Sequence, residues 1–417
     1  MTKEIWVYSE KSSVRLNYVL NFISQVWEIQ LHVCHELDQF KAIDKAKLNY
    51  SNLDLDVIQI IPHEILFKDK IENFDFPSLE KDDFSMIFFL LSRYEEYIIK
   101  DKDQHGRFQP ESSYLFKTNR LHTPWVDVLL GNLKQKIKLK YPEITFKSDL
   151  VETQLTIDID QAFMMKNKSL KRWMGGNLRD LFYMNYKNLK LRNQVYLNFV
   201  KDPWDVYDEI KNHAINFVNP PIFFFQIGNY AEFDKNLSFK NKKFTELIKH
   251  VSTWAKVGLH PSYQSNEDFN LLLEEKVRLE NILGKPVQNS RQHYIKLSLP
   301  KTYKNLLNLG IKNDYSMGYA QQTGFRAGTS HSFFWYDLMQ ELETELKIHP
   351  FCAMDVTLKN YLNFTPNQAN EHLKMLYQNI EGLDGKFRII CHNESLSGYD
   401  QWQNWPKVFL SFFKTDK

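Results

Sequence analysis

The stretch VETQLTIDID, residues 151–160, decides the fold of the larger part of this chain. It begins as a β-strand and ends in two aspartates, Asp158 and Asp160. Alternate side chains of a strand point to the same side, so Thr156 and both aspartates are predicted to share one face. Neighbouring carboxylates repel each other, and a metal ion relieves that repulsion, with one carboxylate as its ligand and the other as a base for a water molecule. The simpler alternative is an aspartate that caps the following helix.

Strands and helices alternate after this stretch. We expect strands at 221–227, 257–260 and 386–395, and helices at 244–255, 269–283 and 369–383. Such alternation predicts an α/β fold with parallel strands and helical crossovers, as in a (β/α) barrel. In these folds functional residues gather at the carboxyl ends of the strands. The chemistry of this part is therefore expected there.

The preceding residues are predicted to form a smaller α/β domain of unknown role. Strands are expected at 5–8, 28–33 and 56–61, and helices at 14–25, 84–98 and 125–140. YPEITFKSD (141–149) is the expected boundary, which divides the chain into domains 1–145 and 150–417. The turn from Asp103 to Arg107 is dense in charge, and packing by ion pairs is the favoured interpretation there.

Bulk properties exclude several classes of protein. The 417 residues suggest two domains, and a net charge of +2 argues against a strongly basic nucleic-acid binder. The three cysteines form no CxxC pair, so neither a zinc ribbon nor a disulfide framework is indicated. The N-terminus lacks the apolar core of a signal peptide, and no apolar run reaches membrane-spanning length. A cytoplasmic location is the default expectation.

Imidazoles and a guanidinium follow other predicted strands. His260 ends the apolar stretch VGLH, and neutral imidazole is a good zinc ligand. Arg291 and His293 are two residues apart, so on a strand they would face the same side, and a buried arginine can orient a carboxylate. His392 ends the apolar strand of RIICHNES and could act as a general acid. Each of these residues could equally be structural.

In this order along one α/β chain, these segments resemble the polysaccharide deacetylase family, the NodB-homology domain of carbohydrate esterases. The resemblance covers about residues 151–410 and is strongest to divergent bacterial members with an extra N-terminal domain. It implies a distorted (β/α) barrel of the polysaccharide deacetylase type. By its motifs, it also implies Asp158 as catalytic base, Asp160 and His260 as metal ligands, Arg291 as the partner of the base, and His392 as the general acid.

The chain departs from the family pattern at one metal ligand. The family's second motif has another histidine four residues after the first, and Gln264 stands there. Catalytic zinc sites normally have three protein ligands. His293 could supply the missing ligand, Gln264 could bind weakly through its carbonyl oxygen, or the site could hold no metal in a non-hydrolytic protein. We favour His293.

Three further residues are candidates for substrate binding. Asp314, in NDYSMGY (313–319), resembles the acid of the family's fourth motif. Arg326 lies between small residues, and Trp335 could stack on a sugar, although a core-filling aromatic strand is the favoured interpretation of the aromatic residues. Separately, residues 164–201 hold nine Lys or Arg and one Asp among aromatic residues. They could contact an anionic membrane or glycan, or form a solvated helix face.

The resulting prediction is a metal-dependent hydrolase, with zinc as the expected ion, that removes an N-acetyl group from a sugar or glycan. The alternative is a non-catalytic glycan-binding or scaffolding protein with a degenerate metal site. The substrate is not indicated by the sequence.

Overall fold

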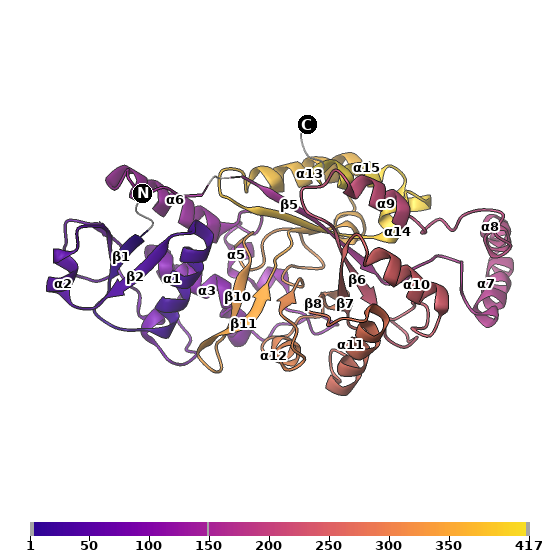
Figure 1. Cartoon of the computed structure of the whole chain (residues 1–417), viewed down its shortest axis with the longest axis horizontal. Helices are drawn as coiled ribbons and strands as arrows, with labels where there is room; N and C mark the ends of the chain where they lie inside the picture. The colour runs from indigo at the N-terminus through magenta and orange to yellow at the C-terminus, as the bar shows by residue number, and fades with distance from the viewer. Residues whose placement is uncertain (1–3, 148–149, 414–417) are drawn as a thin grey trace.

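The predicted strand at 151–160 forms β5 (Glu152–Ile159), in the interior of a nine-stranded sheet (Figure 1). The computed structural model describes residues 4–147 and 150–413. In spatial order the strands are β10 (Phe333–Asp337), β11 (Leu342–Ile348), β9 (Asn313–Asp314), β8 (Asn289–Ser290), β7 (Lys256–His260), β6 (Ile222–Gln226), β5, β13 (Lys386–His392) and β12 (Ala353–Met354). Their described ladders are parallel except that between β10 and β11.

The central strands are buried on both faces, as parallel strands covered by helices must be. All five residues of β6, IFFFQ, are buried. The helices of this part are α7 (Leu170–Phe182), α8 (Tyr186–Tyr196), α9 (Tyr207–Ala214), α10 (Lys242–Val251), α11 (Phe269–Leu283), α12 (Lys301–Asn308), α13 (Pro366–Gln378), α14 (Asn393–Leu396) and α15 (Trp405–Leu410). The predicted strands at 221–227, 257–260 and 386–395 and helices at 244–255, 269–283 and 369–383 are confirmed by β6, β7, β13, α10, α11 and α13.

The sheet has two ends. Among the described residues no ladder joins β10 to β12, so the expected distorted barrel is not confirmed. The structure establishes a mixed α/β fold with a large, mostly parallel sheet. The antiparallel hairpin of β10 and β11, which the sequence analysis did not predict as a pair, forms one edge. Helices from the N-terminal region pack against this hairpin.

A second, four-stranded parallel sheet lies in the N-terminal region. Its order is β2 (Gln30–Cys34), β1 (Glu4–Tyr8), β3 (Ala46–Asn49) and β4 (Ile58–Gln59). The helices of the region are α1 (Val14–Trp27), α2 (Leu37–Ala42), α3 (Asp83–Leu91), α4 (Glu95–Ile98), α5 (Tyr114–Lys117) and α6 (Trp125–Lys140). The helix predicted over 84–98 is interrupted, because Arg93 adopts a positive φ of 54° between α3 and α4.

Buried contacts join this region to the large sheet. The Arg15 guanidinium donates to Glu341 (2.8 and 2.6 Å), and the Tyr18 hydroxyl donates to the carbonyl of Phe334 (2.8 Å). Residues 148–149 of the predicted boundary lie outside the described residues. The division into domains 1–145 and 150–417 therefore stays a prediction.

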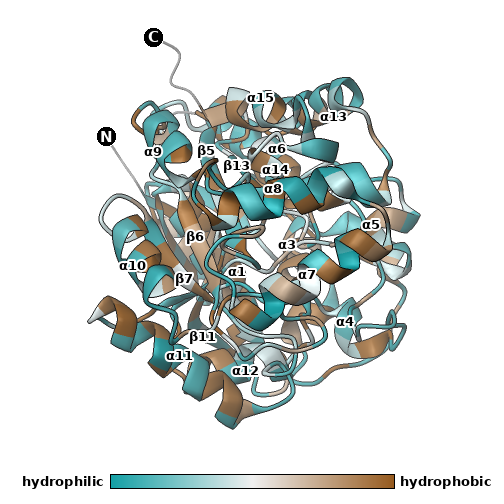
Figure 2. Cartoon of the chain, turned by 90° about the vertical axis from the view of Figure 1, so that its right-hand side faces the viewer, coloured by the Kyte–Doolittle hydropathy of each residue, from teal (hydrophilic) through white to brown (hydrophobic). Residues whose placement is uncertain are grey.

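Helices α7 and α8 form a hairpin that projects from one end of the molecule (Figure 1). It contains most of the basic aromatic segment 164–201. Figure 2 looks onto the hairpin and shows hydrophobic residues among the polar ones on α7. Within residues 4–147 and 150–413, no helix combines the length and the apolar character needed to cross a membrane.

Candidate metal centre

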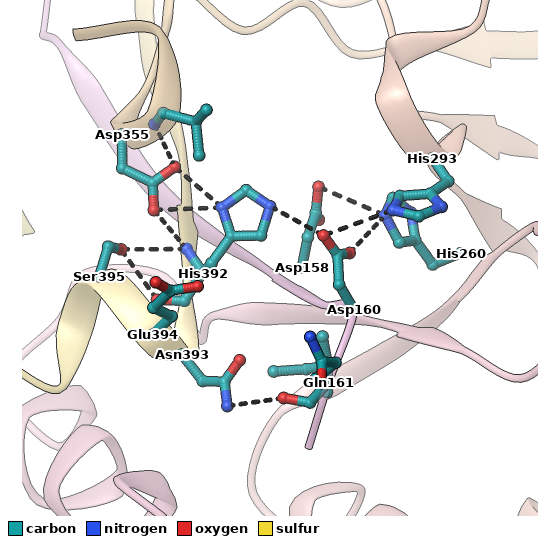
Figure 3. A network of polar contacts seen from close by, with 12 residues as sticks. Asp158, Asp160, Gln161, His260, His293, Asp355, His392, Asn393, Glu394 and Ser395 are labelled. Atoms are coloured by element: carbon teal, nitrogen blue, oxygen red, sulfur yellow. Dashed lines mark hydrogen bonds and ion pairs between the residues drawn. The ribbon is translucent and has the colours of Figure 1, made fainter. Parts of the chain in front are cut away.

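The acidic end of β5 lies beside the end of β13. The two strands are parallel, and Asp158 is paired in register with His392. Asp158 is 2% exposed, whereas the Asp160 side chain, just after the strand, is 37% exposed. Figure 3 shows both carboxylates between His392 on one side and His260 and His293 on the other. The predicted clustering at the strand end is therefore seen in the structure.

Arg291 holds the first of these carboxylates. Its Nη1 donates to Asp158 Oδ1 at 3.0 Å, and its Nε donates to the carbonyl of Tyr315 at 3.0 Å. The guanidinium is fully buried and lies over the Phe224 ring, 4.6 Å from its centroid. In such a dry environment the guanidinium fixes the orientation of the carboxylate.

Asp160, His260 and His293 form a group suited to a metal ion. One potential ligand atom from each lies within 4.8 Å of the others. The Nε2 atoms of His260 and His293 lie 3.2 and 3.4 Å from the Asp160 carboxylate oxygens (Figure 3). Asp160 Oδ1 is buried and makes no hydrogen bond among the described residues beyond this ion-pair contact with His260. One carboxylate and two imidazoles are a donor set that zinc accepts.

The second nitrogen of each imidazole is held from behind. His260 Nδ1 contacts the Arg291 carbonyl at 2.6 Å, and His293 Nδ1 contacts Asp234 Oδ1 at 3.0 Å. Such contacts fix the ring and leave Nε2 directed at Asp160, an arrangement that is common where histidines bind a metal. Burial alone would lower the pKa of His293, but Asp160 and Asp234 raise it to about 9.

Gln264 does not take part in this group. Its side chain is exposed, and it does not line the pocket. His293 instead joins Asp160 and His260, although the strand assumed for it is wrong: β8 ends at Ser290, and His293 begins a 3₁₀ turn, His293–Ile295. Tyr294 has a positive φ of 59° in this turn.

His392 approaches from the opposite side of Asp160. Its Nδ1 lies 2.9 Å from Asp355 Oδ1, and its Nε2 lies 3.6 Å from Asp160 Oδ2 (Figure 3). Asp355 also accepts the backbone N–H of His392 at 2.6 Å. Burial would lower the pKa of His392, but Asp355 and Asp160 raise it to about 10. Asp355 therefore orients the ring and favours its charged form.

The carboxylates and imidazoles line a pocket of about 410 Å³. Phe233, Tyr294 and Tyr361 add aromatic walls, and Arg107 adds a cation from the N-terminal region. Arg107 donates to Asp103 Oδ2 (2.7 Å) and to the carbonyl of Tyr294 (2.8 Å). The ion-paired turn expected at 103–107 is thus confirmed, but the sequence analysis missed that it forms part of the pocket wall. No local pattern could reveal a neighbour so distant in the chain.

The three predicted substrate-binding residues lie elsewhere. Trp335 on β10 is 1% exposed and packs edge-on against Tyr303. Arg326 is buried and pairs with Glu96 through two contacts of 2.9 and 2.7 Å. Asp314 accepts bonds from the backbone and hydroxyl of Ser316, and burial raises its pKa to about 6. None of the three lines the pocket, because each side chain packs against or pairs with other residues of the protein interior.

Comparison with known proteins gives one family match. Residues 5–142 match DUF7033, a family of unknown function. No curated protein matches the chain.

Several solved structures align with the chain at low identity. A Mycobacterium smegmatis protein assigned as a polysaccharide deacetylase aligns over 64% of this chain and 85% of its own, with 13% identity and a TM-score of 0.40. The polysaccharide deacetylase Bc1974 from Bacillus cereus aligns over 63% and 86%, with 12% identity and a TM-score of 0.29. A mutant of a CE4 family pseudoenzyme with restored enzymatic activity aligns over 68% and 79%, with 12% identity and a TM-score of 0.31.

Proposed function

We propose that this chain is a metal-dependent hydrolase that removes an N-acetyl group from a sugar or glycan. The observation that carries the proposal is the convergence of three units in one pocket. These are the ion pair of Asp158 with Arg291, the Asp160–His260–His293 group, and the imidazole of His392. The order of these residues along the chain also resembles the motifs of polysaccharide deacetylases.

Asp160, His260 and His293 would hold the ion, and their donor types favour zinc. The ion, when bound, polarises a carbonyl group and lowers the pKa of a water molecule. Asp234 and the Arg291 carbonyl hold the two imidazoles in place. These contacts favour tight binding because they orient the ligands before the ion arrives.

Asp158 is the proposed general base. Arg291 occupies Oδ1, while Oδ2 lies 3.9 Å from His260 Nε2 on the side of the metal group. The free oxygen is thus placed to take a proton from the water that attacks the acetyl carbonyl. Arg291 does not reach the pocket lining, so it is a positioning residue.

His392 is the proposed general acid. Asp355 holds Nδ1, so Nε2 faces the pocket from the wall opposite His260 and His293. It can donate a proton to the amine nitrogen as the C–N bond breaks, which yields acetate and a free amine. Base and acid therefore stand on two sides of the proposed metal position.

The test is release of acetate from N-acetylglucosamine oligomers by protein stripped with a chelator and reloaded with Zn²⁺. The wild-type chain is expected to bind one ion and to release acetate. Asp158→Asn should keep the ion but lose roughly 10²–10⁴-fold in kcat, the usual contribution of a general base. His293→Ala should lose the ion. Gln264→Ala is the matched control, and it should keep both properties because Gln264 is exposed outside the pocket.

The alternative, a non-catalytic glycan-binding protein, predicts different results. It predicts far less than one zinc ion per chain and glycan binding that His293→Ala leaves unchanged. Folded, zinc-loaded protein that binds the oligomers but releases no acetate would overturn the proposed hydrolysis.

A further inference from the structure

A second pocket, of about 490 Å³, adjoins the proposed metal centre. Gln161 and Lys235 line both pockets. Gln161 directly follows Asp160 at the end of β5, so the two cavities meet at the acidic strand end. Helices α7 and α8 form the outer wall of the second pocket. A ligand in the metal pocket can therefore extend under the hairpin.

The second pocket is lined by cations. Its lining includes Lys168, Arg172, Arg179, Arg192 and Lys235, and none of its described lining residues is acidic. Arginine guanidinium groups match the oxygens of phosphates and carboxylates through paired hydrogen bonds. So dense a group of like charges is unfavourable unless an anion balances it.

Carboxylates nearby balance these charges only in part. Asp180 lies behind the pocket and accepts from Arg192 at 2.9 and 2.8 Å and from Arg179 at 3.2 Å. The Asp202 carboxylate is engaged by backbone N–H groups, including that of Met165 at 2.7 Å.

The guanidinium of Arg172 is held in place by neutral groups. It donates to the backbone carbonyls of Lys235 (2.8 Å) and Asn236 (3.1 Å). These contacts fix the position of the guanidinium, which also lies over the Tyr230 ring, 4.7 Å from its centroid, but neither carbonyl carries a negative charge.

The pKa of Lys168 is lowered by burial and by the excess of positive charge in this pocket. Burial, followed by repulsion from Arg172, lowers its pKa to about 8; Asp202 opposes this shift, and Arg192 and Arg179 add to it. Its Nζ donates to Gln161 Oε1 at 3.3 Å, so the ammonium faces the junction of the two pockets. A bound anion would relieve the repulsion.

Gly176 shapes the wall, whereas its neighbour Gly175 does not. A Cβ atom on Gly176 would lie 2.6 Å from the Arg192 guanidinium, whereas one on Gly175 would meet nothing within 4 Å. Gly176 therefore allows Arg192 to lie close to the helix, with its side chain in the lining. This arrangement suits a site that holds the oxygens of an anion.

We propose that the second pocket binds a phosphoryl group of the substrate, whose N-acetylated sugar lies in the metal pocket. The proposal rests on the proposed deacetylase function and narrows its substrate to a sugar phosphate or diphosphate. The phosphoryl group can come from a nucleotide-linked or a lipid-linked sugar. The hairpin of α7 and α8 favours the lipid-linked source, because Phe182, Tyr183 and Met184 at its turn are 72–79% exposed. Exposed apolar side chains beside basic ones are typical of contact with a lipid chain or a membrane surface.

The experiment measures binding by calorimetry to the full chain, both zinc-loaded and chelated. The probes are N-acetylglucosamine, its 1-phosphate, UDP-N-acetylglucosamine, a polyprenyl diphosphate N-acetylglucosamine in detergent, and N-acetylneuraminic acid as a carboxylated sugar. We expect the phosphorylated sugars to bind at least 10-fold more tightly than the neutral and carboxylated ones. Lys168→Gln/Arg179→Gln should remove that difference, while Lys171→Gln/Lys187→Gln, which changes the net charge equally outside the lining, should not.

The outcomes separate this inference from the deacetylase function. Equal affinity for neutral and phosphorylated sugars, or tighter binding of the carboxylated sugar, overturns the phosphoryl site even if acetate is released. Phosphate-dependent binding that the Lys168/Arg179 variant abolishes supports it even if no acetate is released. Phe182→Ser/Met184→Ser should weaken only the lipid-linked probe if the lipid is the source, and should leave all affinities unchanged if the nucleotide is.

Discussion

Replacement of Glu96 by glutamine should destabilise the protein. It removes one negative charge from a buried cluster of two carboxylates and two guanidinium groups, whose charges otherwise cancel. Glu96 on α4 accepts from Arg326 at 2.9 and 2.7 Å and from Arg93 at 2.8 Å. Glu95 pairs with Arg93 at 2.7 Å, and all four side chains are 3% exposed or less. The change leaves two buried guanidinium groups with one carboxylate.

The expected loss of stability is a few kcal/mol. Removal of one partner from a buried ion pair costs about 3–5 kcal/mol, because the remaining charge is left uncompensated. Burial would raise the pKa of Glu96, but Arg326 and Arg93 lower it from 4.5 to about 2. Such a shift corresponds to about 3 kcal/mol. Because the folded pKa is depressed, this contribution is complete above pH 4.5 and is lost as the pH falls towards 2.

The assay is urea denaturation at pH 7, followed by circular dichroism. The double variant Glu96→Gln/Arg326→Met restores neutrality, since Arg93 keeps Glu95, and it should recover most of the lost free energy of unfolding. Glu371→Gln is the control, because its ion pair with Lys374 is exposed and should contribute less than about 1 kcal/mol.

A loss below about 1 kcal/mol for Glu96→Gln, or a double variant less stable than the single one, would refute this account of the buried group. If Arg326 instead bound substrate, as predicted from the sequence, its replacement would raise KM without a change in stability.

Three further predictions concern the site and the pH dependence of stability. Asp234→Asn should weaken zinc binding roughly 10–100-fold in a chelator competition assay, since it loosens the hold on His293, and unchanged affinity would count against that contact. Gln264→His should not tighten zinc binding in the same assay, because the side chain is exposed outside the pocket; a gain would show that the loop can reach the ion. Burial and His122 lower the pKa of His372 to about 4, so stability should fall on the order of 2 kcal/mol as the pH drops from 6.5 to 4. His372→Gln should flatten that part of the stability profile, and an unchanged slope would contradict the assignment.

The periodicity of apolar residues predicted the strands and helices with a clear apolar pattern. The helices over 125–140 and 269–283 begin and end as predicted, because apolar spacing specified them and, for α11, Asp268 caps the start and Gly284 allows the left-handed end. The acidic strand end at Asp158 and Asp160 was also predicted from the sequence, since the alternation of side chains along a strand places both on one face. These features depend only on residues close in the chain.

The three-dimensional arrangement decided the rest of the site. His293 lies beside Asp160 because a 3₁₀ turn, not a strand, carries it there. Asp234 and Arg107 come from distant loops, and no pattern in their own segments indicates the pocket. Trp335 is an aromatic residue of the core, which composition alone could not distinguish from a sugar platform.

The sequence by itself therefore determined the acidic strand end and the strands and helices with a clear apolar pattern, such as β6 and α11, because each depends on neighbouring residues. Only the tertiary structure decided which imidazoles meet Asp160, which buried cations are neutralised within the protein, and which remain unbalanced in the pocket beneath α7 and α8. Burial and charge pairing are properties of packed segments, and they arise only when distant parts of the chain come together.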